Sequence, residues 1–213
     1  MASRKLGSVL SEFSKRMRES RRLASDAYLW SSRATKKATP YISDKRRDSI
    51  VELAFLRAFL AWEAFLEESF ILYLLGRTSP GGYSPKRYYF PPNQTMATEW
   101  LAEGKDYAKW ANCQEVERRA FRHFEQGSPF SQSLRSNQSV LSDANAIRNM
   151  IAHESASAQV KFESIVRREL GTLPITGTAG AFLGMTVPTS TPPISFLDFY
   201  ISKFESCAAL IIP

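Results

Sequence analysis

The residues best suited to chemistry in this chain lie close together, between Ser142 and His153. Placed on a helix at about 100° per residue, this stretch has an apolar face and a polar face. The polar face carries Ser142, Asn145, Asn149 and His153, with Arg148 at its edge. An imidazole, with an ordinary pKa of about 6.5, can take or give a proton, and a guanidinium can hold phosphate oxygens. The spacing predicts a helix, capped by Ser142, that packs on one side and presents Arg, Asn and His on the other.

The same stretch resembles a known motif. Arg148 and His153 stand five residues apart, as in the Arg-x4-6-His motif of HEPN domains, small all-helical proteins of which many are ribonucleases. The surrounding AIRNMIAHE is similar to the RiboL-PSP type of HEPN domain. Arg118 also stands five residues before His123, and such motif matches carry a false-positive risk. We prefer the later pair because Asn149 follows its Arg and aliphatic residues flank it. The alternative is an amphipathic helix with a solvated polar face.

The segment from about residue 44 to residue 75 predicts a long helix, with Gly76 as its C-terminal stop. It is apolar on nearly all sides, which is typical of a helix at the centre of a bundle. Arg57, Glu63 and Glu67 are among the charged residues that interrupt it. Because a charge at the centre of a bilayer costs about 3 kcal/mol on insertion scales, we expect no membrane span.

This long helix adds to the resemblance. Its sequence AFLRAFLAWEAFLEESF looks like the helix that precedes the motif helix in HEPN proteins and commonly carries an acidic residue in an aromatic setting. Glu63, next to Trp62, is the matching position. The resemblance implies that Glu63 orients Arg148 or His153. The alternative is a buried glutamate that pairs with Arg57 or another cation.

Composition bounds the class of protein. The chain has 213 residues, 44% hydrophobic and 23% charged, which suits one soluble globular domain with or without an appendage. The first residues lack the pattern of a signal peptide, and the two cysteines lie far apart, so we expect a cytoplasmic protein with reduced thiols. Two His and two Cys without ligand-like spacing predict no metal site. No cofactor is expected either.

The positive charge is concentrated in residues 1–44, which we interpret as a basic N-terminal helical arm with a helix over about 6–30. The first 49 residues contain 13 Lys/Arg and 5 Asp/Glu, a net charge of +8, whereas the rest contain 15 and 16. Such an arm can attract RNA phosphates. The alternative is a solvated helix that happens to be basic.

Two segments are rich in turn-forming residues and predict loops, residues 77–96 and residues 172–196. In the first loop, Lys86, Arg87, Tyr88 and Tyr89 combine cations with aromatic rings, a mixture that can hold phosphates and stack bases. The alternative is an aromatic loop that covers helix ends. Between and after these loops we expect helices over 97–126 and 157–170, a turn at 127–136, and a last helix that starts near Ser195.

The predicted fold is an all-α bundle of about five or six helices, with residues 45–213 as a HEPN-like domain. The resemblance implies a metal-independent endoribonuclease of a toxin or phage-defence system that acts on RNA, with an antitoxin or a nucleotidyltransferase as candidate partner. Its catalytic residues would be Arg148, His153, Asn149 and Glu63. Five residues apart on a straight helix, Arg148 and His153 point about 140° from each other, so we also expect a homodimer that shares its active centre. The alternative to this dimer is a monomer in which the long Arg148 side chain curls back toward His153. The alternatives are a non-catalytic HEPN module that binds RNA or a nucleotide, and a helical interaction protein.

Overall fold

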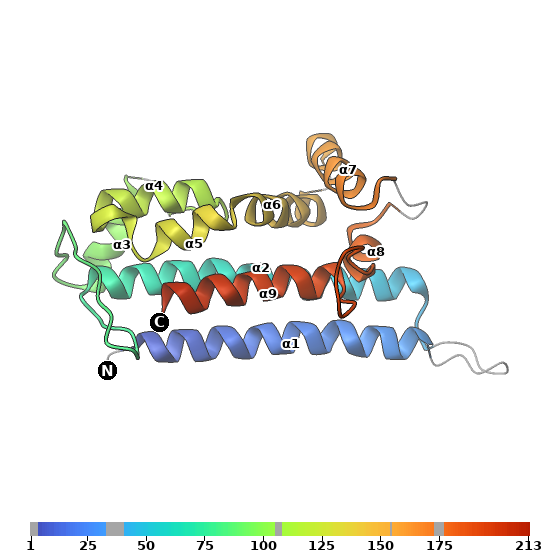
Figure 1. Ribbon diagram of the computed structural model, residues 1–213, viewed down its shortest axis with the longest axis horizontal. Coiled ribbons are helices and arrows are strands. Elements are labelled where there is room, and N and C mark those ends of the chain that lie inside the picture. Colours follow the sequence, from blue (N-terminus) through green and yellow to red (C-terminus); the bar gives the residue numbers. More distant parts are fainter. Residues whose placement is uncertain (1–3, 33–40, 105–107, 154, 173–176) are drawn as a thin grey trace. The chain divides into compact units, whose positions relative to one another are not determined.

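The computed structural model describes residues 4–32, 41–104, 108–153, 155–172 and 177–213, and within these ranges the chain is built from helices (Figure 1). The longer helices are α1 (Leu6–Ser32), α2 (Asp44–Leu74), α6 (Gln138–His153), α7 (Ala156–Leu170) and α9 (Phe196–Ile211). The shorter ones are α3 (Gln94–Ala102), α4 (Cys113–His123), α5 (Phe130–Ser136), α8 (Ala179–Gly184) and the 3-10 turn η1 (Glu125–Gly127). The predicted all-α fold is confirmed, with nine α-helices in the described residues where five or six were expected.

The helices form two compact units. The first contains Met1–Lys15, Ala61–Ser142 and Lys203–Pro213, and the second contains Arg16–Leu60 and Asp143–Ser202. Parts of α1, α2, α6 and α9 therefore belong to each unit. None of the described helices combines the length and the apolar character that crossing a membrane requires.

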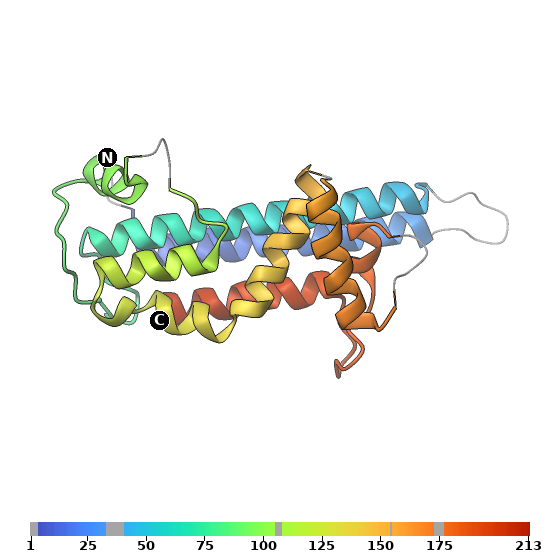
Figure 2. The same ribbon diagram turned by 90° about the horizontal axis from the view of Figure 1, so that it is seen from above.

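Aromatic rings fill the core of the first unit. The ring of Phe70 lies 4.8 Å from that of Phe130, 4.9 Å from that of Phe124 and 5.5 Å from that of Trp110, measured between centroids. Trp62 on α2 stacks on Phe204 of α9 at 5.5 Å. The short helices α4 and α5 pack against each other above this core, as Figures 1 and 2 show. Burial of large rings is the main favourable contribution to such a core.

The second unit has its own core, in which Phe182 of α8 is completely buried. Its ring stacks on Phe196 at 4.3 Å and meets Phe162 of α7 edge-on at 5.8 Å. An ion pair between Arg168 of α7 and Asp143 of α6 ties these two helices together. The motif helix is thus fixed by α7 as well as by its own apolar face.

Several predicted helix ends are confirmed. Gly76 follows α2 with a φ of +77°, and the amide of Arg77 donates to the Leu72 carbonyl, which is the hydrogen-bond pattern of a glycine-terminated helix. Ser195 accepts from the Asp198 amide at 3.1 Å and donates to the Asp198 carboxylate at 2.8 Å. These ends are set by short-range chemistry, which is why the sequence predicts them.

Three local predictions are wrong. Ser142 is not a cap, because α6 begins at Gln138, only Asn137 away from the end of α5. The expected turn at 127–136 contains α5, whose Phe130 and Leu134 are buried one helical turn apart. The expected loop at 172–196 contains α8, which begins after Thr178 caps it through the Ala181 amide at 3.2 Å.

One further expectation is only partly met. Most apolar residues of α2 are buried, as a central helix requires, but Leu53 and Leu60 are 49% and 53% exposed. These two leucines stand seven residues apart, so they lie on one stripe of α2 within the second unit. Among the described residues, this stripe of α2 is therefore left partly uncovered.

Candidate functional site

The motif helix α6 has the two faces that its sequence predicts. Ala144 and Ile147 are fully buried, whereas His153 is exposed and Arg148 and Asn149 are half-buried. The buried positions follow the apolar spacing of the helix, and the polar side chains point away from them. Arg148, Asn149 and His153 all lie in the last part of α6, within the second unit.

These polar side chains form a chain of contacts. Nη1 of Arg148 donates to Oδ1 of Asn149 at 3.1 Å and lies 3.4 Å from Nε2 of His153. Nδ2 of Asn149 donates to Oδ1 of Asn145 at 3.5 Å. Because a guanidinium can only donate, His153 accepts through Nε2, and a neutral His153 then carries its proton on Nδ1. A cation and a proton acceptor are therefore side by side on a surface that solvent reaches.

This contact corrects one step of the sequence interpretation. The directions of the two side chains from the helix axis suggested that one phosphate would be awkward to reach from both Arg148 and His153 within a single chain, unless Arg148 curled back toward His153. The structure shows that the long Arg148 side chain turns along the helix and reaches His153. The geometric reason for sharing the two residues across a dimer therefore falls away, while the dimer itself stays a prediction.

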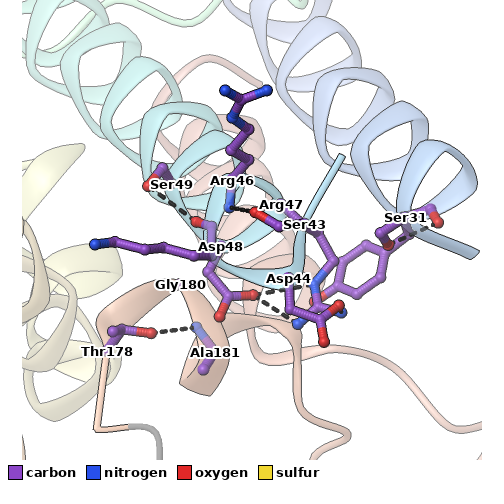
Figure 3. A network of polar contacts seen from close by, with 12 residues as sticks. Ser31, Ser43, Asp44, Arg46, Arg47, Asp48, Ser49, Thr178, Gly180 and Ala181 are labelled. Atoms are coloured by element: carbon purple, nitrogen blue, oxygen red, sulfur yellow. Dashed lines mark hydrogen bonds and ion pairs between the residues drawn. The ribbon is translucent and has the colours of Figure 1, made fainter. Parts of the chain in front are cut away.

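A pocket of about 560 Å³ lies beside the motif helix in the second unit. It is lined by Met150 and Ile151 of α6, the start of α2, and residues 177–179 before and at the start of α8. Figure 3 shows the adjoining network, in which Arg47 bridges Asp44 at 2.7 Å and Asp48 at 2.8 Å.

The charge of this pocket decides what it can hold. Three carboxylates, on Asp44, Asp48 and Glu52, line it against the single cation of Lys45. Glu52 is engaged, since its Oε1 accepts from the Gly180 amide at 2.9 Å. Arg47, which pairs with Asp44 and Asp48, offsets a further part of this charge, and one net negative charge remains. A negative charge disfavours phosphates, so a phosphodiester fits the Arg148–His153 face better than this pocket.

Glu63, the fourth predicted catalytic residue, is half-buried on the part of α2 that belongs to the first unit. Arg148 and His153 belong to the second unit. Its role in orienting either of them stays a prediction.

The predicted RNA-binding loop uses its two cations for internal contacts. Nζ of Lys86 pairs with Glu125 at 3.2 Å. Nη1 of Arg87 donates to the Leu74 carbonyl at 2.7 Å, at the end of α2, and its guanidinium stacks on Phe90 at 4.8 Å. Arg87 thus closes a helix C-terminus, where unpaired carbonyls favour a cation.

The aromatic side chains of the same loop are free to contact a ligand to a greater extent than its two cations, which make internal contacts. Tyr88 and Tyr89 are 54% and 52% exposed. Tyr89 lies beside a second pocket, of about 370 Å³, together with Trp100 of α3 and His123 of α4. This grouping was missed in the sequence because its three members come from three separate segments. The sequence does indicate one relationship in this region. Arg119 and His123 are spaced by one helical turn, which places them on the same face of a helix.

The competing motif pair and the basic arm also have defined surroundings. Arg118 is exposed whereas His123 is buried, so the two do not present a joint polar face. In the basic arm, Arg4 pairs with Glu68 at 2.8 Å and Arg21 pairs with Asp198 at 3.2 Å. Part of the excess positive charge therefore stabilises the helices, and binding of RNA by the arm stays a prediction.

Within the part of the chain that the structure describes, no three His, Cys, Asp or Glu side chains come together as metal ligands would. Cys113 and Cys207 are buried and free, and burial raises the pKa of both thiols. Comparison with protein-family models, with curated proteins and with solved structures found no match to this chain.

Proposed function

We propose that the chain is a metal-independent endoribonuclease of the HEPN type, acting as a toxin or phage-defence effector on RNA. The observation that supports this most is the 3.4 Å approach of the Arg148 guanidinium to Nε2 of His153 on the polar face of α6. It joins the residues of the motif that resembles HEPN ribonucleases. The all-helical fold is compatible with a HEPN core, which is part of the proposal.

The chemistry starts from the 2′-hydroxyl that RNA carries beside each phosphodiester. His153 takes the proton of this hydroxyl through Nε2, and the resulting oxyanion attacks the neighbouring phosphorus. The bond from phosphorus to the 5′-oxygen breaks, and this oxygen takes a proton from the protonated His153 or from water, which leaves a 2′,3′-cyclic phosphate and a 5′-hydroxyl. The other assignment, in which His153 protonates the departing 5′-oxygen, yields the same products.

Arg148 supplies the fixed positive charge. Its planar guanidinium can donate to two phosphate oxygens and stabilise the charge that develops on the phosphorane. Nη1 of Arg148 lies 3.4 Å from Nε2 of His153 and donates to its lone pair. When a phosphate binds Arg148, that lone pair is released for the 2′-hydroxyl. Asn149 holds Nη1 of Arg148 from the other side.

A homodimer and a neutralising antitoxin or nucleotidyltransferase partner belong to the proposal through the resemblance to HEPN proteins. Each chain already brings its own Arg148 and His153 together. A dimer would therefore set two complete pairs opposite each other rather than complete a divided one.

The proposal is tested by the products that the purified protein makes from a mixed-sequence RNA in the presence of EDTA. We expect cleavage to continue, because Arg148 and His153 supply the charge and the proton transfer, and we expect cyclic-phosphate and 5′-hydroxyl ends by mass spectrometry. Activity that returns only with added Mg²⁺, or 5′-phosphate ends, would contradict this chemistry. Binding of RNA without cleavage would instead favour a non-catalytic RNA-binding module.

A further inference from the structure

The pocket of about 370 Å³ in the first unit has two unusually open aromatic walls. Tyr89 is 52% exposed and Trp100 is 38% exposed, although aromatic rings gain most by burial. The Tyr89 ring meets the His123 ring edge-on at 5.5 Å. The volume lies near the lower end of the roughly 300–1,000 Å³ that small-molecule sites occupy. The pocket therefore has the size and the walls for one flat ring system.

One side chain that lines this pocket, His123, also belongs to a small group of buried side chains with unpaired polar atoms. Among the described residues, Nδ1 of His123, Nε of Arg119 and Nε1 of Trp110 are buried without a hydrogen-bond partner. The three side chains are 8%, 8% and 5% exposed, respectively. A buried polar group without a partner costs about 1–3 kcal/mol. Of the three side chains, His123 is the one that lines the pocket among the described residues, so a polar contact with a ligand would come from its imidazole and the remaining contact from the aromatic rings.

Arg119 brings a buried positive charge to α4, and the carboxylates of Glu103, Glu115 and Glu67 are near enough to interact with it. It lies one helical turn before His123 on α4, and its guanidinium stacks on Trp110 at 4.6 Å. Nη1 donates to the Lys109 carbonyl at 3.3 Å, and no carboxylate of the described ranges forms an ion pair with it. A nearby group rich in acceptor atoms would compensate this buried charge.

His123 provides the edge that can recognise a base. Burial lowers its pKa, and the adjacent charge of Arg119 lowers it further, so the imidazole is neutral at neutral pH. A neutral imidazole has one donor and one acceptor. Nucleobases offer donors and acceptors along their edges and two aromatic faces, which matches a pocket lined by His123, Tyr89 and Trp100.

We propose that the Tyr89–Trp100–His123 pocket binds a nucleobase, stacked on the two aromatic rings with its edge at His123. As a site of RNA recognition it rests on the proposed function, whereas base binding itself needs no catalysis by Arg148 and His153. The base can come from a free nucleotide or from an unpaired position of a strand.

The chain contains only two histidines, which makes a direct test possible. The Hε1 signals of His123 and His153 can be assigned in NMR spectra with the variants His123→Gln and His153→Gln. AMP, UMP and a short 2′-deoxy oligonucleotide are then titrated into the full-length protein, with ribose 5-phosphate as the probe without a base. The 2′-deoxy strand prevents cleavage by the proposed mechanism during the measurement.

We expect a saturable shift of the His123 signal with AMP, UMP or the oligonucleotide, and none with ribose 5-phosphate. Tyr89→Leu and Trp100→Leu should each weaken binding by about 5- to 150-fold, because stacking on an aromatic side chain contributes about 1–3 kcal/mol per base. Tyr41→Leu and Trp30→Leu, which replace exposed aromatic residues outside the pocket, should bind as the unmodified chain does. Melting curves confirm that each variant is folded.

The outcomes of the titrations distinguish a free nucleotide from a nucleic-acid strand as the source of the base. A shift with the mononucleotides indicates a free nucleotide, and a shift with the oligonucleotide alone indicates a strand. No shift of the His123 signal with any probe, an equal shift with ribose 5-phosphate, or unchanged binding in folded Tyr89→Leu and Trp100→Leu would overturn the proposal. None of these readouts depends on cleavage, so they leave the ribonuclease proposal to its own test.

Discussion

His153→Ala and Arg148→Ala should each abolish RNA cleavage while the chain stays folded. Loss of a positioned general base or acid lowers a rate by about 10²- to 10⁴-fold, and loss of a group that stabilises transition-state charge lowers it by about 10²- to 10³-fold. His153 is exposed and Arg148 is half-buried, and neither belongs to the buried core. Substitutions at such positions usually change stability by less than about 0.5 kcal/mol.

The control for this prediction is Arg167→Ala, which removes an exposed arginine from α7 in the same unit. Its cleavage rate should equal that of the unmodified chain, because Arg167 is outside the Arg148–His153 face. Initial rates on one labelled RNA, together with circular dichroism and melting curves, give the comparison. Full activity of His153→Ala would remove His153 from the mechanism. An equal loss in Arg167→Ala would indicate a general effect of charge.

Gly180→Ala should destabilise the protein strongly. A Cβ atom at Gly180 would lie 2.1 Å from the carbonyl oxygen of Asp48 and 2.6 Å from its carbonyl carbon, so the backbones of α8 and α2 would have to separate. Overpacking of this kind costs about 1–3 kcal/mol, and more when backbone must move. The Gly180 amide also donates to Glu52 at 2.9 Å, and this hydrogen bond would be strained.

The measurement is the melting temperature, which in a chain of this size falls by about 2–4 °C per kcal/mol. Gly177→Ala is the matched control, because a Cβ atom at Gly177 would meet nothing within 4 Å. It should melt close to the unmodified protein. Equal melting temperatures for Gly180→Ala and Gly177→Ala would show that α8 does not pack on Asp48 as described.

The sequence predicts which face of the motif helix is buried, but it does not predict where the ends of its long polar side chains lie. The spacing of Ala144 and Ile147 identifies the buried face, because helical periodicity depends only on neighbouring residues. The approach of Arg148 to His153 depends on the rotamers of a long side chain, which spacing does not determine. That is why the two residues were expected to diverge and are found together.

The same distinction applies to the fold. The C-terminus of α2 is predicted by Gly76 and the N-terminus of α9 by Ser195. The conformation or hydrogen bonds of these two residues involve only neighbours a few positions away in the sequence. The six-residue helix α8 has a short-range signal only at its start, where Thr178 is the N-cap, and a helix this short is stable only through its packing. Phe182, buried between Phe162 and Phe196, supplies that packing from segments far away in the sequence.

Cleavage of an RNA with a single 2′-deoxy nucleotide immediately before one mapped cleavage site tests the central claim most directly. The proposed chemistry needs the 2′-hydroxyl as nucleophile, with Arg148 and His153 acting on it and on the adjacent phosphate. We predict that cleavage at the substituted site disappears, while other sites in the same molecule are cut at their usual rates. Continued cleavage at the 2′-deoxy position would contradict the account.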